Sequence, residues 1–386
     1  MPRILRCKGK YTIPQFTQLW KPVAQTLPNT PELTSRGNRP LQMDFEHHLK
    51  ALVFYHLEGH VSAQELLQEL RENDFARQYI APRGGIEKSS FSEAINSRGL
   101  EQFLYVFEQL YSQAYQTLPE QHAELGELIA IDGSLIDGVL SMTWADYRKG
   151  SKKAKSHLGF DINRSIPRKV YLTDGKGDER PFVSKILNPG QTGVMDRYYQ
   201  HHSNFDLYQQ EDKHFICRIR ENTKKICIKS NVLPEGSFIF YDALVLLGTP
   251  YVNQTKKEVR LVGYTIDGTK YWIATDRFDL TAEQVAMAYK LRWEVEKFFA
   301  WWKRHLNVYH LIARSEHGLM VQILAGLITY LLLAIYCHEE HGEKVSIKRV
   351  RELRNQIRNE VARLGEEDTE QQHSDLHGDF SVHASP

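Results

Sequence analysis

Apolar residues in the stretch 288–306 recur at the spacing of a helix, and this stretch is the most informative in the chain. On a helix of 3.6 residues per turn, Leu291, Val295 and Trp302 face one side and predict a buried stripe. One carboxylate, Glu296, stands beside this stripe among cationic side chains. A solvent-exposed helical face with an ordinary ion pair would show the same local pattern. Residues elsewhere in the chain must therefore distinguish a functional site from an exposed ion pair.

The first 120 residues carry further helical patterns. They predict helices at 43–57, 62–70 and 100–118, and Ser62 and Ser90 each precede a glutamate by three positions, as in a capping box. The first two helices and their glycine-containing turn fit a DNA-binding helix-turn-helix, although any antiparallel helix pair gives the same pattern. Cations available here for phosphate groups are Arg71, Arg77, Arg83, Lys88 and Arg98.

Short apolar runs replace the helical spacing from residue 127 onward. Strands are predicted at 128–132, 154–162, 168–174, 193–199 and 214–220, with short helices near 181–187 and 205–211. Three strands followed by alternating helices and strands match a ribonuclease-H-like sheet, so the predicted fold class is α/β (α+β). Residues 222–276 are again β-rich, with a hairpin at Asp267-Gly268, and are interpreted as an insertion before the 288–306 helix.

Two more helical patterns follow. Residues 318–336 are long and apolar enough to cross a bilayer, but a buried core helix has the same hydropathy. We prefer the core helix because no cationic anchors flank the stretch. Residues 344–364 predict a basic amphipathic helix that lies on DNA, on a partner subunit or in water. The acidic, polar stretch 365–386 predicts disorder.

Composition narrows the function mainly by exclusion. The chain has 386 residues, enough for two or three domains, and its formal net charge of +1 gives no global attraction to nucleic acid. Its four cysteines are scattered, which argues against a structural zinc site or a disulfide framework and suits a reducing cytoplasm. The first residues are basic and polar and lack the apolar core of a signal peptide.

Three carboxylates stand out by their contexts: Asp132 and Asp196 at the ends of predicted strands, and Glu296 on the helix. Two divalent ions about 4 Å apart speed phosphodiester cleavage, and hard carboxylate oxygens suit Mg²⁺. We therefore predict that the three carboxylates are catalytic and hold two Mg²⁺ ions, which Mn²⁺ can replace, with Asp132 as the bridge. Without metal they would repel one another, so a raised pKa is expected. Cations near the first strand that are candidate phosphate contacts include Lys152, Lys153 and Lys155.

Other ionisable residues nearby are poorer ligands. Asp137 lies five residues after Asp132, on the opposite face of an extended chain. Asp161 and Asp174 are interpreted as turn or strand-end residues, and Asp146 is a further carboxylate that could be mistaken for a ligand. The histidines lack the paired spacing of a metal site, namely His157, His201, His202 and His305.

The spacing Tyr289-(2)-Arg292-(3)-Glu296-(6)-Lys303 is far more specific than any single carboxylate. Together with the segments LIAIDGS, KSHLGFDI and GVMDRYY, it resembles the DDE transposases of bacterial insertion sequences, specifically the IS-four group. The likeness covers roughly residues 128–333. It implies a ribonuclease-H-like catalytic core interrupted by a β insertion, with a helical N-terminal region that binds transposon ends.

The resemblance implies a cut-and-paste DNA transposase. Such an enzyme would bind terminal inverted repeats, hydrolyse the phosphodiester bond at the transposon ends with Mg²⁺ and transfer the 3′-OH strand into target DNA. Tyr289, Arg292 and Lys303 would contact phosphates or bases near the cleaved end. Relatives often continue Arg-Gly-Tyr or Arg-Glu after the second aspartate, where this chain has Arg-Tyr-Tyr, so Arg197 is kept as a DNA contact.

Joining two ends calls for a synaptic complex, so the expected partners are DNA and a second copy of the chain. We expect a homodimer in the bacterial cytosol, associated with the nucleoid when bound to DNA, and no membrane. The expected domains are an end-binding region, a first part of the core, the β insertion, a second part of the core, a basic helix and a tail, at 1–120, 121–221, 222–276, 277–340, 341–364 and 365–386.

Three alternatives to an active transposase stay open. A non-catalytic protein that binds transposon ends is one, although such a binder would not need to retain all three carboxylates. A different metal nuclease on the same fold, with an accidental match to the helix spacing, is the second. A membrane protein built on 318–336 is the third.

Overall fold

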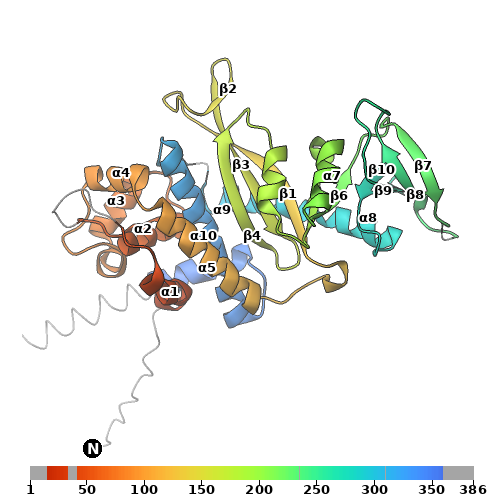
Figure 1. The fold of residues 1–386 in the computed structure, drawn as a ribbon. Helices are drawn as coiled ribbons and strands as arrows, with labels where there is room; N and C mark the ends of the chain where they lie inside the picture. Colours follow the sequence, from red (N-terminus) through yellow and green to blue (C-terminus); the bar gives the residue numbers. More distant parts are fainter. Residues whose placement is uncertain (1–14, 34–40, 234, 309, 360–386) are drawn as a thin grey trace, which may run out of the picture. The chain divides into compact units, whose positions relative to one another are not determined.

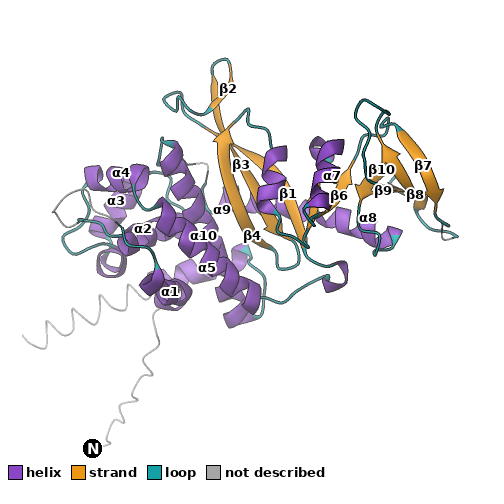
Figure 2. Cartoon of the chain, in the orientation of Figure 1, coloured by secondary structure: helices purple, strands orange, loops and turns teal. Residues whose placement is uncertain are grey.

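The computed structural model describes residues 15–33, 41–233, 235–308 and 310–359, which are coloured in Figures 1 and 2. The chain divides into two compact units. One takes in the described residues up to Leu110 and from Leu324 onward, and the other is Tyr111–Ile323. Each unit has its own architecture.

The first unit is helical. Its described helices are α1 Gln15–Thr26, α2 Phe45–Glu58, α3 Ala63–Glu72, α4 Lys88–Ser97, most of α10 Glu316–His341, the first part of α5 Leu100–Thr117 and a helix at 347–359, with a 3₁₀ turn at Leu27–Asn29 and a π-helical turn at Ala76–Ile80. Ser62 caps α3 as predicted, because its side chain accepts a hydrogen bond from the Glu65 amide at 3.1 Å. The cap expected at Ser90 is wrong: α4 starts earlier, at Lys88, so Ser90 lies inside the helix.

The basic helix of residues 347–359 packs within this unit. Val350, Leu353 and Ile357 are buried on one side of it. Arg358 forms an ion pair with Glu58, and Arg354 donates a hydrogen bond to the carbonyl of Leu57. Two of the cations expected to be available for DNA or a partner are therefore held by the end of α2. The predicted residues 360–364 and the acidic tail lie outside the described part of the chain.

The second unit is built on a ten-stranded sheet. The strands are β1 Leu128–Asp137, β2 Asp146–Arg148, β3 Ser151–Asp161, β4 Ile166–Asp174, β5 Thr192–Met195, β6 His214–Arg218, β7 Lys225–Ser230, β8 Ile239–Leu247, β9 Val259–Ile266 and β10 Thr269–Thr275. They run in the order β2-β3-β1-β5-β6-β10-β9-β8-β7, and β4 also pairs with β3. Antiparallel β4, β3 and β1 beside parallel β1, β5 and β6 confirm the predicted ribonuclease-H-like arrangement.

The β-rich stretch 222–276 continues the same sheet. Its hairpin turns at Asp267-Gly268 as predicted, and β10 pairs antiparallel with β6, with Thr275 opposite Ile216. Figure 2 shows these strands following β6 along one sheet. The stretch is thus inserted in the sequence but joined to the core by backbone hydrogen bonds.

Strand β1 is longer than predicted. The sequence predicts its end at Asp132 because Gly133 and Ser134 follow, and these residues have low β-propensity. In the structure β1 runs on to Asp137, because β3 pairs with it up to Asp137–Lys153. Asp132 therefore lies inside a strand and not at its end.

The predicted 288–306 helix is also interrupted. The chain forms α8 Ala282–Leu291 and α9 Trp293–His305, with Arg292 between them. The Arg292 amide bonds to the carbonyl of Tyr289, and the Val295 amide to that of Arg292, both at 3.2 Å. These three-residue steps tighten the turn locally. The apolar stripe is buried as predicted, with Trp302 only 1% exposed.

Helices cover the sheet on the side of Ile129 and Ile131, where a core cluster includes residues of α6 Val183–Ile186 and α7 His202–Gln210. Short 3₁₀ turns stand at Ala123–Leu125, Arg180–Phe182 and Arg197–Tyr199. Neighbouring strand residues point to opposite faces, so Ala130 and Asp132 face away from this cluster. Phe160, paired with Ala130, packs against Phe298 of α9 on that other face, with ring centroids 5.0 Å apart.

Among the described residues, α10 is the helix that is long and apolar enough to cross a membrane. Of its most apolar window, 89% is buried inside the protein. This agrees with the interpretation of the stretch 318–336 as a core helix.

Candidate functional site

The parallel pairing of two strands brings the first two predicted ligands together. Ala130 and Val194 are the last residues paired between β1 and β5. Asp132 follows inside β1, and Asp196 comes directly after Met195, the last residue of β5. Because ligands in open α/β sheets bind at the carboxyl ends of parallel strands, both carboxylates lie at the edge where a site is expected. Asp196 also accepts a hydrogen bond from the Tyr198 amide at 2.8 Å, which orients it.

The Asp132 carboxyl is buried, and two other carboxylates act on it. The pKa of Asp132 is raised from 3.8 to about 7, chiefly by burial and also by the charges of Glu179 and Asp196, while Arg292 opposes the rise. The pKa of Asp132 is thus raised in the expected direction, although burial, and not repulsion between carboxylates, is the largest cause. A bound cation would favour the ionised form of the Asp132 carboxyl and so lower its pKa.

Glu296 is connected to these aspartates through Arg292. The Arg292 guanidinium bonds to a Glu296 carboxylate oxygen at 2.7 Å, and its side chain is 9% exposed. The same guanidinium interacts electrostatically with Asp132. It is flanked by the rings of Tyr289 and Trp293, whose centroids lie 5.8 and 5.6 Å from it. Arg292 is thus held in place by aromatic rings while it interacts with two of the three predicted ligands.

The donor chemistry fits a hard divalent cation. All three predicted ligands offer carboxylate oxygens, the preferred ligands of Mg²⁺. Within the part of the chain that the structure describes, no group of three or more His, Cys, Asp or Glu side chains is already arranged to hold a metal. Glu296 faces Arg292 instead. The assignment of Asp132, Asp196 and Glu296 as ligands therefore stays a prediction.

The lysine of the helix pattern reaches β1. Lys303 donates a hydrogen bond from its ammonium to the Leu135 carbonyl at 2.8 Å. Burial lowers the pKa of this ammonium, while the charges of Asp137 and Asp132 oppose the change. Tyr289, at 5% exposed, is buried beside Arg292. Within the pattern, Arg292 and Lys303 thus interact with residues of β1, whereas the Tyr289 ring lies 6.3 Å from the Tyr271 ring of β10.

Comparison with known proteins identifies the family. A family model described as "Transposase DDE domain" matches residues 124–332, more than half of the chain. The chain belongs to this family. The match contains all three predicted ligands and confirms the resemblance found in the sequence.

Three curated relatives are transposases by name. The chain is 29% identical over 194 residues to a probable transposase for insertion sequence element IS5377 of Geobacillus stearothermophilus, covering 50% of this chain and 52% of that protein. It is 23% identical over 279 residues to a putative transposase for insertion sequence element IS4SA of Synechocystis, covering 69% and 77%. It is 24% identical over 200 residues to the putative transposase y4zB of Sinorhizobium fredii, covering 50% and 56%. The chain thus spans about half of the first relative.

The cations predicted to contact phosphates in this DDE-domain chain have acidic neighbours. Lys152 lies 3.5 Å from an Asp146 oxygen, and Lys153 pairs with Asp137. Lys155 is 12% exposed and lies 3.2 Å from Glu179. Lys152 and Lys153 therefore pair with carboxylates other than the predicted ligands, whereas Lys155 pairs with Glu179.

Glu179 is the site residue that sequence reasoning missed. It follows β4 in a loop, just before the 3₁₀ turn Arg180–Phe182. It forms an ion pair with Lys155 of β3 and accepts a hydrogen bond from the Tyr199 hydroxyl. No strand, helix or motif in the sequence marks it. Only the pairing of distant segments reveals it.

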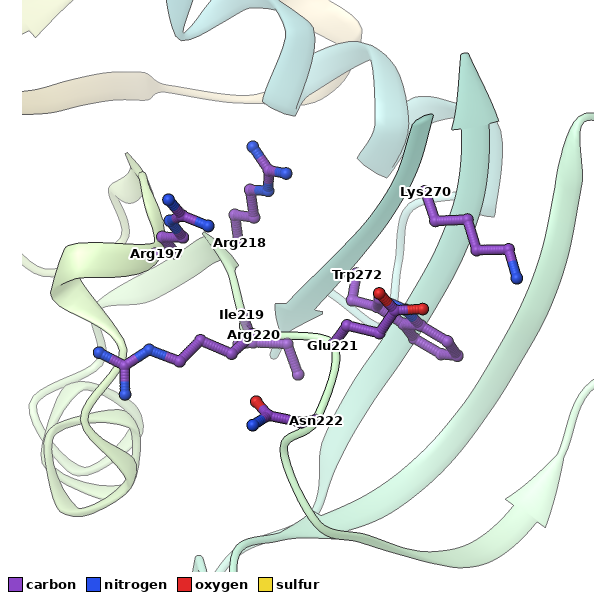
Figure 3. Close-up of a pocket in the computed structure, with 8 residues that line it drawn as sticks. All are labelled: Arg197, Arg218, Ile219, Arg220, Glu221, Asn222, Lys270 and Trp272. Carbon is purple, nitrogen blue, oxygen red and sulfur yellow. The ribbon is translucent and has the colours of Figure 1, made fainter. Parts of the chain in front are cut away.

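A basic cavity of about 610 Å³ lies beside Asp196 in the chain, and Arg197 lines it. Figure 3 shows arginine side chains on one side of it and Lys270 and Trp272 of β10 on the other. Its full lining is Arg197, Arg218, Ile219, Arg220, Glu221, Asn222, Lys270 and Trp272. Trp272 packs edge-on against Phe240 at 5.1 Å, as the packing interpretation of this tryptophan expects.

Proposed function

We propose that this protein is a DNA transposase that cuts the ends of an insertion element with divalent metal ions and joins the freed 3′-OH to target DNA. The observation that carries the proposal is the juxtaposition of Asp132 and Asp196 at adjacent parallel strands, with Glu296 linked to Asp132 through Arg292. Membership in the transposase DDE domain family supports it.

In this mechanism Asp132, Asp196 and Glu296 hold the metal, which is Mg²⁺ with Mn²⁺ as a substitute. When bound, two such ions supply charge stabilisation on both sides of the scissile phosphate. Arg292 aims Glu296 and keeps a positive charge near Asp132 until the site is loaded. The low dielectric around these partly buried groups strengthens each interaction.

DNA binding in this proposal uses cations around the carboxylates. Lys303 and Arg292 border β1, and Arg197 lines the basic cavity next to Asp196. Contacts of this kind fix the position of the backbone without reading its sequence. Lys152 and Lys153 would extend the same surface along β3.

Recognition of the inverted repeats by the helical unit, and assembly of a homodimer on two ends, belong to the same proposal. Helices α2 and α3 form the expected pair around Gly59. The exposed side of α3, however, carries Glu65 and Glu72 as well as Arg71. These carboxylates repel phosphate, so end recognition needs cations outside α3.

The test uses the full chain, Mg²⁺ and DNA that carries the ends flanking its own gene. Glu296→Gln keeps the shape of the side chain and removes its charge. Glu294→Gln is the matched control, because Glu294 lies one half-turn away on α9 and pairs with Lys297 at 2.7 Å. We expect cleavage by the parent and by the control, and binding without cleavage by Glu296→Gln.

Two results would overturn the proposal. If the parent binds the ends and cuts with neither Mg²⁺ nor Mn²⁺, the protein is a non-catalytic binder. If Glu296→Gln cuts as fast as Glu294→Gln, Glu296 is not a ligand. Cleavage without preference for the repeats would indicate a different metal nuclease.

A further inference from the structure

A fourth carboxylate stands against the strand that carries Asp132. A methyl group built on Gly133 would lie 2.4 Å from the carboxylate carbon of Glu179 and within 2.6 Å of both of its oxygens. Real atoms never approach so closely, so the lack of a side chain at residue 133 makes room for Glu179. The close approach of Glu179 thus explains why a glycine follows Asp132 in the sequence.

Both oxygens of Glu179 have partners, on the face of the sheet that Gly133 shares with Ile131. The buried Tyr199 donates its hydroxyl to one oxygen at 2.8 Å, and the Lys155 ammonium lies 3.2 Å from the other. Lys155 also donates to the Gly177 carbonyl at 2.9 Å, which ties it to the loop before Glu179. Because each oxygen has a partner, the position of the Glu179 carboxylate is fixed from two sides.

The Glu179 carboxylate lies against the backbone beside Asp132, as its close approach to Gly133 shows. Among the described residues, the ion-pair partner of Glu179 is Lys155 on the neighbouring strand β3. A structural ion pair that merely anchors the loop after β4 would have no need to lie against the residue next to Asp132.

We propose that Glu179 is a positioning residue of this site, which holds Tyr199 and Lys155 against the Asp132–Gly133 backbone and strengthens divalent-metal binding without touching the metal. This inference rests on the proposed function, since it assumes that Asp132 holds a divalent ion. Groups that orient metal ligands from outside the coordination sphere commonly change metal affinity by one to two orders of magnitude.

The experiment measures Mn²⁺ affinity of the full chain by calorimetry or electron paramagnetic resonance, without DNA. Glu179→Gln removes the charge, and its amide oxygen still accepts the Tyr199 hydroxyl. Asp178→Asn is the matched control, because this neighbour is exposed and pairs with Arg180 at 2.9 Å. We expect Glu179→Gln to bind Mn²⁺ about 10-fold more weakly and Asp178→Asn to bind it as the parent does.

Gly133→Ala tests the geometry independently. The added methyl displaces the Glu179 carboxylate, so Mn²⁺ binding should weaken as in Glu179→Gln. The double variant Gly133→Ala with Glu179→Ala should be no worse than Glu179→Ala alone, because the clash has been removed. Such non-additivity is the signature of direct contact.

The outcomes separate this inference from the proposed function. Unchanged Mn²⁺ affinity in Glu179→Gln overturns the inference and leaves the transposase proposal standing. If Glu179→Gln loses Mn²⁺ binding as completely as Asp132→Asn, Glu179 is itself a metal ligand and the inference is also overturned. Absence of Mn²⁺ binding by the parent would overturn both. If Glu179→Gln melts below the assay temperature, Tyr199→Phe, which removes one hydrogen bond to Glu179, should weaken Mn²⁺ binding in the same direction, and unchanged affinity there counts against the inference.

Discussion

Lowering the pH should destabilise this fold through His157, which lies on β3 directly opposite Gly133. The imidazole is 1% exposed and stacks on Phe182 with ring centroids 4.1 Å apart. Thr173 lies 2.9 Å from its Nε2 atom. Burial and, to a smaller extent, the charge of Lys155 lower the pKa of His157 from 6.5 to about 4, while Asp178 opposes them. The folded protein therefore keeps this histidine neutral.

The sign follows from proton linkage. Between the two pKa values the unfolded chain binds a proton at residue 157 and the folded chain does not, so the free energy of unfolding falls as the pH falls. The contribution is fully present above the unfolded pKa of 6.5 and is lost as the pH drops toward about 4. At about pH 5 the loss is roughly 2 kcal/mol, since each pKa unit is worth about 1.4 kcal/mol.

The assay is urea unfolding of the parent and of His157→Gln at a series of pH values from about 8 to about 5. The variant is less stable at neutral pH but should lose about 2 kcal/mol less across this range, because residue 157 no longer titrates. His201→Gln, which removes an exposed histidine, is the control and should follow the parent. Equal losses in the parent and in His157→Gln would refute the reasoning.

Three other perturbations have expected magnitudes. Trp302→Ala should lower the free energy of unfolding by about 3–5 kcal/mol, because the side chain is 1% exposed in the α9 core. Trp301 is partly exposed, so Trp301→Ala should lower the free energy of unfolding clearly less. Equal urea midpoints for the two variants would contradict this prediction. Asp242→Asn should cost roughly 3–5 kcal/mol in the same assay, since it leaves the buried Arg260 guanidinium without its two-point partner; a loss near zero would contradict it. Mg²⁺ at ten times its Kd should stabilise the parent by about 1.4 kcal/mol in thermal melts, and Asp132→Asn should abolish the gain; an equal gain in the variant would place the ion elsewhere.

Local patterns were enough to predict most elements of this chain. The buried stripe from Val295 to Trp302, the hairpin at Asp267-Gly268 and the cap at Ser62 each depend on neighbours within a few residues, and all three are confirmed. The spacing of Tyr289, Arg292, Glu296 and Lys303 was likewise visible, and the family match supports its interpretation.

Other features required the paired sheet. The extension of β1 beyond Asp132 depends on β3, and the joining of 222–276 to the core depends on the β10–β6 pair. The break at Arg292 depends on bonds that it makes with both helices and with Glu296. The two strand pairings join residues far apart in the sequence, whereas the bonds at Arg292 are local and compete with a continuous helix that the apolar spacing also allows.

The sequence by itself therefore indicated most of the elements and the family, and it is the source of the prediction of the three carboxylates, because helical and strand periodicity and a spaced motif are local or linear properties. The tertiary structure alone decided which charges meet. Glu179 became part of the site because β1, β3 and the loop after β4 converge at Gly133, where the absence of one methyl group leaves room for a carboxylate. Lys155 and Gly177 are 22 positions apart, and Gly133 and Glu179 are 46 positions apart. Contacts over such separations are not visible in any local sequence pattern.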